Sequence, residues 1–340
     1  LAIGLVYGGL RVVADEPAGQ ASANGQPLAG TAPPARFYAG FSGYTRRVTC
    51  SSAEAQRWFD QGLQLLYGYN HEEAIRSFEM AAAIDSSCAM AWWGSAYARG
   101  LHINNPVMGE EQSRLANEAA QKAVAALDDE LDVERALIGA VCQRYRWPAP
   151  EDHLPLDRAY AEAMERVWHQ FPSDPDVGAL YAESLMNLQP WDLWTGQGEP
   201  KGRTLEIVAV LERALVRTPM HPGANHFYIH AIEASPWPQQ GLPAAERLTG
   251  LVPGSGHLTH MPSHIFIRVG RYAEAAAANE RAIKADEAYL AVAPKPDFYS
   301  LYFMHNVHFL AYAAMMEGRY QTAIAAARKI EKDIPPEFLK

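Results

Sequence analysis

The stretch RWFDQGLQLLYGYNHEEAIRSFEMAAAIDSS, residues 57–87, predicts a helical hairpin. Apolar residues recur three and four positions apart on both sides of a short GYN break, and this spacing is typical of two helices that each bury one face. Small residues let two such helices approach closely, and aromatic residues fill the space between them. Residues of these two kinds recur at intervals of four, twelve, four and three: Trp58, Gly62, Ala74, Phe78 and Ala81.

This pattern resembles the tetratricopeptide repeat (TPR), a helix-turn-helix unit about 34 residues long. Trp92 lies 34 residues after Trp58, and the resemblance recurs in GRYAEAAAANERAIKAD (270–286) and EGRYQTAIAAARKI (317–330). We count about seven helix pairs between residues 53 and 333, with an insertion near 191–203. The resemblance implies an all-α fold over residues 37–340, in which stacked repeats form a right-handed superhelix with a concave groove.

Residues 1–36 do not follow the repeat pattern, and we expect them to form an extended N-terminal arm. LAIGLVYGGLRVV (1–13) is mostly apolar but too short to cross a bilayer alone, and a Pro/Gly-rich linker follows it. The apolar segment is either the remainder of a signal or membrane anchor or a strand that docks on another copy. The first alternative favours an exported protein, whether periplasmic, membrane-anchored or extracellular, and the second a homo-oligomer assembled through residues 1–13.

Composition limits the classes of partner. The formal net charge is −10 without a long Lys/Arg run, so we expect no nucleic acid partner. The three cysteines form no CxxC motif, which argues against a thiolate zinc site. Cys50 and Cys88 each precede a helical segment and are candidates for a disulfide if the protein is exported.

Histidines supply the strongest indication of chemistry. Seven of the 12 fall in three short windows, and spacings of three and four keep each group on one helix face. Pro262 predicts a helix start near Leu258 or Thr259, with His257 on the incoming loop. The three windows hold His226 and His230 with Glu233 in NHFYIHAIE, His257, His260 and His264 in GHLTHMPSH, and His305 and His308 in MHNVHF.

In the TPR resemblance these positions face the groove of three successive repeats. Neutral imidazole is a common ligand for copper, zinc and iron, so we predict a multi-histidine transition-metal site formed by the seven histidines and Glu233. Two alternatives stay open, namely a metal-free groove that binds a small ligand or an acidic peptide, and structural polar packing. HFYIH lacks the Glu of an HExxH zincin, and the sequence assigns no catalytic residue.

Further groove or ligand-binding candidates are Glu183 and Asn187 in LYAESLMNLQ and Trp191 and Trp194 in the insertion. His71 is interpreted as a solvated residue, and His102 as part of a polar turn. The leading functional hypothesis is a groove-binding TPR-type protein with a metal site. The alternative is a metal-free scaffold that binds a peptide or protein partner or assembles through its arm.

Overall fold

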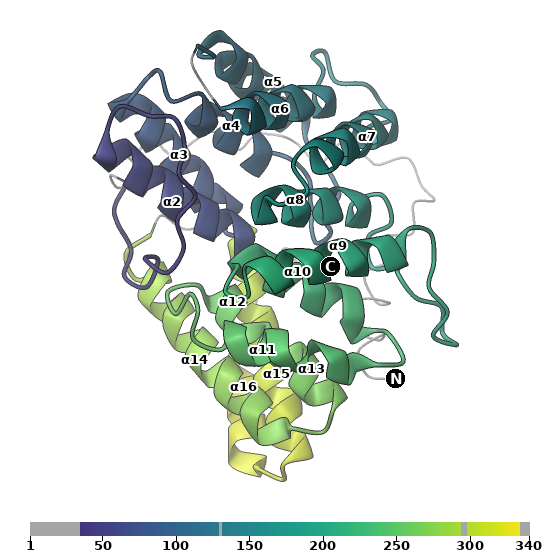
Figure 1. The fold of residues 1–340 in the computed structure, drawn as a ribbon. Coiled ribbons are helices and arrows are strands. Elements are labelled where there is room, and N and C mark those ends of the chain that lie inside the picture. Colours follow the sequence, from purple (N-terminus) through teal and green to yellow (C-terminus); the bar gives the residue numbers. More distant parts are fainter. Residues whose placement is uncertain (1–34, 129–130, 294–297, 334–340) are drawn as a thin grey trace. The chain divides into compact units, whose positions relative to one another are not determined.

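Helices form the framework of the parts that the computed structural model describes, which are residues 35–128, 131–293 and 298–333; within them there is no β-strand. Consecutive helices joined by short connections pack against each other (Figure 1). The predicted all-α fold is therefore confirmed. The packed pairs are α2 (Ala53–Tyr67) with α3 (His71–Ile84), α4 (Ala89–Ala98) with α5 (Glu110–Ala125), α6 (Asp132–Val141) with α7 (Leu154–Gln170), α8 (Pro175–Met186) with α9 (Thr204–Arg217), α10 (Pro222–Glu233) with α11 (Leu242–Leu248), α12 (Gly256–His260) and α13 (Pro262–Arg268) with α14 (Tyr272–Leu290), and α15 (Tyr299–Met316) with α16 (Tyr320–Asp333).

The first pair shows why the small residues of the repeat pattern are needed. The side chain of Ser52 accepts hydrogen bonds from the first backbone N–H groups of α2 and so starts that helix. A Cβ atom on Gly62 would lie 2.8 Å from the ring of Phe78, and one on Gly94 only 2.5 Å from it. Phe78 of α3 therefore fits between α2 and α4 only because both neighbours lack a side chain at these positions.

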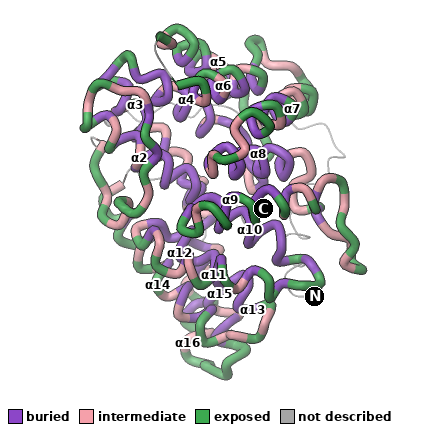
Figure 2. Tube along the Cα trace, viewed as in Figure 1, coloured by how far each residue is buried: buried purple, intermediate pink, exposed green. Residues whose placement is uncertain are grey.

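The first helices of successive pairs form an inner layer. Contacts join α2 to α4, α4 to α6, α8 to α10, α10 to α13 and α12 to α15. A further contact joins α2 directly to α10, so the first repeat lies against the fifth. All twelve residues of α10 are buried, whereas the residues of α16 are exposed or intermediate apart from Ala326 (Figure 2). The space along the inner layer beside α10 is thus filled by the protein's own side chains.

A buried ionic cluster around Asp176 of α8 holds this closed arrangement. The carboxylate accepts hydrogen bonds from Tyr67 Oη at 2.6 Å, His221 Nε2 at 3.0 Å and Arg46 Nη1 at 2.8 Å, and also from Tyr44 Oη. Although burial alone favours the protonated acid, Arg46 and His221 hold the pKa of Asp176 well below its usual range. The segment before α2, α2 itself and α8 are therefore tied together through one carboxylate.

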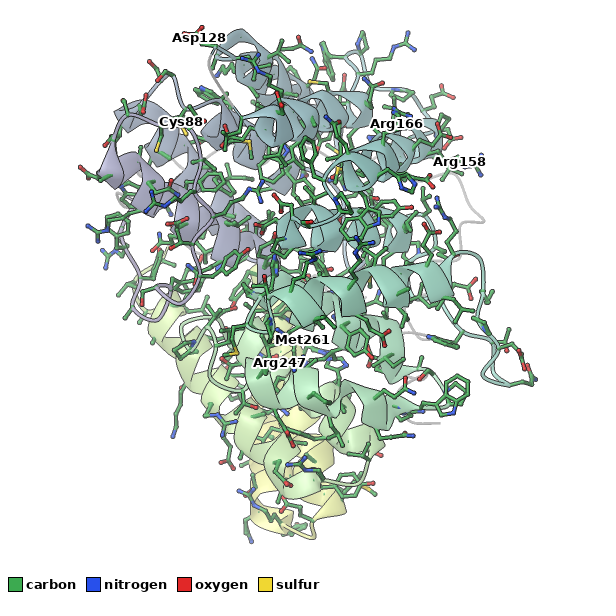
Figure 3. All side chains as sticks on the ribbon, in the orientation of Figure 1. Cys88, Asp128, Arg158, Arg166, Arg247 and Met261 are labelled. Atoms are coloured by element: carbon green, nitrogen blue, oxygen red, sulfur yellow. The ribbon has the colours of Figure 1, made fainter. Side chains whose placement is uncertain are left out.

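The helix around Pro262 starts earlier than the sequence predicts. Ser255 caps α12 through its side chain, which accepts from Leu258 N, and His257 lies inside that helix rather than on a loop. Met261, labelled in Figure 3, ends α12, and Pro262 begins α13. The proline is tolerated because it occupies a first helical turn, where its missing N–H is not needed. Because a new helix begins directly after the break, all three histidines of the window lie in helices, His257 and His260 in α12 and His264 in α13.

The disulfide suggested for Cys50 and Cys88 is not formed, since both are free thiols. Cys50 Sγ is directed instead at the Ser52 carbonyl oxygen, 3.5 Å away, and burial raises the pKa of Cys88 to about 12. The expected arm and its assembly strand, residues 1–13, lie outside the described residues. In the described parts of the chain, none of the helices combines the length and the hydropathy that crossing a bilayer requires.

Candidate metal centre

Six of the seven predicted histidines meet inside the inner layer. Helix α10 carries His226 and His230, α12 carries His257 and His260, α13 carries His264, and α15 carries His305. Their rings are buried, except that His305 is intermediate. Neighbouring ring centroids lie 4.7 to 4.9 Å apart in several pairs, for example 4.8 Å for His226 with His257 and 4.7 Å for His260 with His305. Stacking of three repeats therefore brings the three windows together.

His260 and His264 face each other through nitrogen lone pairs. His260 Nδ1 donates to Asn279 Oδ1 at 2.6 Å, and the orientation of that amide is fixed because Asn279 Nδ2 donates to the Ala275 carbonyl at 2.8 Å. His264 Nδ1 donates to Glu233 Oε2 at 2.7 Å. With both protons on Nδ1, the two Nε2 atoms carry lone pairs, yet they lie 2.8 Å apart. Two lone pairs at this distance repel unless a cation, either a proton or a metal ion, lies between them.

Glu233 orients two of the rings at once. Its Oε1 accepts from His230 Nδ1 at 2.8 Å while its Oε2 accepts from His264 Nδ1. The Nε2 atom of His230 is then a lone-pair donor that is buried without a hydrogen-bond partner. Histidines that bind metal through Nε2 usually donate their Nδ1–H to a carboxylate just outside the ligand shell. Glu233 stands in this relation to His230 and His264.

The His226 ring is oriented by the first repeat. Its Nδ1 donates to the backbone carbonyl of Tyr67 at 2.7 Å, and its Nε2 lies 3.1 Å from Nε2 of His257. His257 Nδ1 is buried without a partner. The carbonyl of Tyr67 is available for this contact because α2 ends at Tyr67, where the last carbonyl groups of a helix lack intrahelical partners.

Electrostatics keep most of the cluster neutral. Burial, with the neighbouring imidazoles, lowers the pKa of four rings well below the ordinary histidine value, and burial lowers that of His230 in the same direction. Although burial would raise the pKa of Glu233, His264 and His230 hold it well below its usual range. These five rings are therefore neutral beside one carboxylate, which is the state that binds metal. The four strongly shifted rings are His226, His257, His260 and His305.

Two aromatic residues in a strained backbone conformation form part of the wall. Tyr69 has φ 54° and Trp191 has φ 60°, in the left-handed region that bulky residues rarely occupy. The Tyr69 ring lies 4.7 Å from that of His226, and the Trp191 ring meets His230 edge-on at 5.0 Å. Among the described residues these two are the non-glycine residues with positive φ, and both contact the cluster. Such strain persists only where the surroundings impose it, and it concentrates at functional sites.

A pocket of about 570 Å³ reaches the outer side of this wall. Tyr69, His102 and Phe298 line it, and the His102 ring stacks on Tyr69 with centroids 4.5 Å apart. Its size is that of a small-molecule site. The sequence interpretation of His102 as part of a polar turn missed its burial, because the contact with Tyr69 joins residues from two repeats.

The remaining predicted residues lie around the cluster. His308 is on α15 but belongs to none of the histidine groups that could hold an ion, and it lines a different pocket. Glu183 accepts hydrogen bonds from Tyr97 Oη at 2.5 Å and Asn187 Nδ2 at 2.6 Å. Trp194 donates to the Ala231 carbonyl at 2.8 Å and so supports α10 from outside.

Sequence reasoning missed three groups that act on the cluster. They are the Tyr67 carbonyl, the Asn279 amide and the Tyr69 ring. A carbonyl group leaves no signal in a sequence. Asn279 follows His260 by 19 residues and lies on α14, beyond α13, so only the packing of α12 against α14 brings the two residues together.

Comparison with known proteins gives similarity in fold only. No family model matches the sequence, and none of the curated proteins matches it significantly. Among solved structures, the chain is similar to the C-terminal part of a TPR repeat-containing protein from Cytophaga hutchinsonii, with 12% identity, coverage of 82% of this chain and 96% of that chain, and a TM-score of 0.40.

Two further solved structures resemble parts of the chain. MamA protein gives 12% identity over 52% of this chain and 82% of that chain, with a TM-score of 0.39. YrrB, described as a TPR protein with an unusual peptide-binding site, gives 15% identity over 61% of this chain and 90% of that chain, with a TM-score of 0.30. The chain thus resembles TPR structures, and these values carry no information on what it binds.

Proposed function

We propose that this protein binds transition metal through the inward-facing imidazoles of α10, α12, α13 and α15. The proposal rests on the pair His260 and His264, whose Nε2 atoms lie 2.8 Å apart while both Nδ1 atoms are held by acceptors. Two ligands bonded side by side to one ion at ~2.0–2.1 Å lie roughly 3 Å apart, close to this separation. A thiolate-free imidazole set suits copper, zinc or iron, and copper binds most tightly where it is available.

A proton shared between the two rings is the alternative to a metal ion. One proton would relieve a single facing pair, and it would leave the buried Nε2 of His230 without a partner. A metal ion accepts several lone pairs at once. The lone pair on His230 Nε2, which has no hydrogen-bond partner, therefore favours a metal ion over a shared proton as the cation of the cluster.

The pocket beside Tyr69 supports a role for a small ligand near the metal. Three protein ligands leave a coordination position open, which would allow metal-activated water or oxygen chemistry. Within such chemistry Glu233 is a positioning residue, because both of its oxygens already accept from imidazoles. The Tyr69 and His102 rings would lie between the pocket and the metal.

Metal analysis of purified protein tests the proposal. The protein should be prepared without chelator, and elemental analysis should find at least one equivalent of metal per chain. The variants His230→Ala and His264→Ala should lose metal, whereas His308→Ala, on α15 but outside the cluster, should retain it. Metal-free wild-type protein that also takes up none of the three metals on dialysis would refute the proposal.

Binding of a protein partner is a second candidate function, favoured by exposed apolar surface on the last helix pair. Met315 is 59% and Tyr320 66% exposed, and a pocket of about 560 Å³ lies between α15 and α16. We propose that this face or the 1–13 arm also mediates self-association. We propose separately that the protein is exported. Light scattering on Tyr320→Glu and on a chain without residues 1–36 tests the two surfaces. The mass of the protein in solution should fall only in the variant that lacks the surface used for self-association.

A further inference from the structure

The histidines form two separate ligand sets. The first, called the His226 set, contains His226, His230 and His257; the second, called the His260 set, contains His260, His264 and His305. Within each set the potential ligand atoms all lie within 4.8 Å of one another, and the two sets share no residue. A third group within the same distance, His230 with Glu233 and His264, takes one histidine from each set and links them. Each set draws on two helices or more, so neither is a local sequence motif.

We infer that the two sets hold two transition-metal ions side by side, three imidazoles to each. This inference rests on the proposed metal-binding function and specifies the stoichiometry and construction of that site. The short Nε2 contacts fall within the sets, at 3.1 Å for His226 with His257 and 2.8 Å for His260 with His264. By ring centroids the two sets adjoin each other, because His230 and His264 of different sets are 5.3 Å apart and His257 and His260 are 5.9 Å apart, against 6.3 Å for His230 and His257 within the first set.

One ion cannot satisfy both facing pairs with the rings as they stand. An ion bonded at ~2.0–2.1 Å lies close to both nitrogens of a facing pair. Helix α12 contributes one histidine to each pair, but among the described residues none of the ligand groups within 4.8 Å contains both pairs. The His260 pair is oriented by Asn279 and Glu233, while His226 is oriented by the Tyr67 carbonyl. Each pair therefore has its own supports and its own metal position.

Glu233 connects the two positions. Its Oε1 holds His230 of the first set and its Oε2 holds His264 of the second, at 2.8 and 2.7 Å. A shift of either ring therefore moves the carboxylate that orients the other. Glu233 thus contacts one ring of each set.

The charge balance indicates which ligand the pair of ions would take. Imidazole binds metal as a neutral ligand, so two divalent ions next to a single carboxylate leave an excess of positive charge. Three protein ligands leave each ion an open position, and ions in two-metal sites lie ~3.5–4 Å apart with a ligand between them. A small anion such as hydroxide, bound between the ions, would fill both open positions.

Metal titration tests the two-ion stoichiometry. The full-length protein is stripped with chelator, titrated with Cu(II), and analysed for bound metal after gel filtration. Wild-type protein should bind two ions, and His257→Asn and His305→Asn should each bind one. His308→Asn, the control on the same helix as His305, should bind two.

Saturation of the wild-type protein at one ion, or loss of all metal in both single variants, would overturn the inference while leaving the proposed function intact. Uptake of no metal by wild-type protein would instead defeat the proposed function. Circular dichroism shows whether each variant is folded.

A second measurement needs no variant. In the electron paramagnetic resonance spectrum of wild-type protein, the second equivalent of Cu(II) should change the line shape because the ions are neighbours, by dipolar broadening with a half-field signal or by loss of intensity where a bridging anion pairs the two spins. An unchanged line shape with doubled intensity would show that the two ions lie far apart, against the inference. Added azide should alter the optical spectrum at two equivalents if a small anion binds between the ions.

Discussion

The backbone carbonyl of Tyr67 accepts a hydrogen bond from Nδ1 of His226 at 2.7 Å, across 159 residues of sequence. This contact joins the end of the first repeat helix to the histidine cluster of the fifth repeat. The Tyr67 hydroxyl meanwhile donates to Asp176 at 2.6 Å. One residue thus connects the ionic cluster that closes the fold with the imidazoles that we propose as metal ligands.

Replacing Asp176 with Asn should strongly destabilise the fold. The buried Arg46 would keep only Asp174 of its two carboxylate partners, so we expect a loss toward the lower end of the about 3–5 kcal/mol that breaking a buried ion pair costs. Urea unfolding of the metal-free protein measures the loss. The control Glu206→Gln breaks the surface pair with Arg203 and should change stability by less than about 1 kcal/mol. Equal effects of the two substitutions would count against the closing role of Asp176.

Glu233→Gln should weaken metal binding without removing an imidazole ligand. An amide offers one acceptor oxygen, so it cannot hold Nδ1 of both His230 and His264 as the carboxylate does. Loss of such outer-shell support lowers metal affinity by about 10- to 100-fold. Competition against a chelator measures the change. Glu212→Gln, which alters an acceptor of Tyr228 on the other side of α10, should leave the affinity unchanged.

The metal-free protein should lose stability as the pH falls below about 6.5. Burial lowers the pKa of His226, His257, His260 and His305 in the folded state, so the unfolded chain takes up protons there that the folded chain does not. Each such histidine contributes a slope approaching about 1.4 kcal/mol per pH unit. Four carboxyls with raised pKa values, among them Asp286 at about 7, act in the opposite direction, but eight histidines of the described chain have lowered pKa values.

Urea titrations of chelator-treated protein at pH 7.5, 6.5 and 5.5 check this expectation. We predict a net loss of at least about 2 kcal/mol over the lower half of the range, given several histidines of that slope. Stability that is flat or rises toward pH 5.5 would mean that the rings are not held neutral in the folded state.

Bound metal should raise the resistance to unfolding. A ligand that binds only the folded protein stabilises it by about 2.7 kcal/mol at a free concentration 100 times its Kd. Thermal unfolding with and without Cu(II) or Zn(II) measures the shift, which chelator should reverse. His264→Ala should reduce the shift, because one of the two metal positions is lost, while His308→Ala should retain it in full. A shift of equal size in both variants would point to binding elsewhere on the protein.

The fold could be predicted from sequence because its determinants are local. The spacing of Trp58, Gly62 and Phe78 reflects contacts inside one helix pair, and the structure has the corresponding close packing. The intervals of three and four among the histidines likewise place His226 with His230, and His260 with His264, on shared faces. Local periodicity therefore indicated both the helices and the rings that could meet.

Contacts between distant repeats could not be predicted in the same way. The packing of α2 on α10, the Tyr67 carbonyl at His226 and the strained backbone of Tyr69 all depend on closure of the chain on itself. The break at Pro262 also depends on context, because the proline begins a second helical segment after Met261. The division of the rings into two sets follows from these long-range contacts.

Anomalous diffraction at the absorption edge of the bound metal tests the central claim most directly. Crystals of the metal-loaded protein should show a peak between the Nε2 atoms of His260 and His264, within ~2.0–2.2 Å of each. A map in which both rings keep their positions, with no anomalous peak between them, would contradict metal ligation by this cluster.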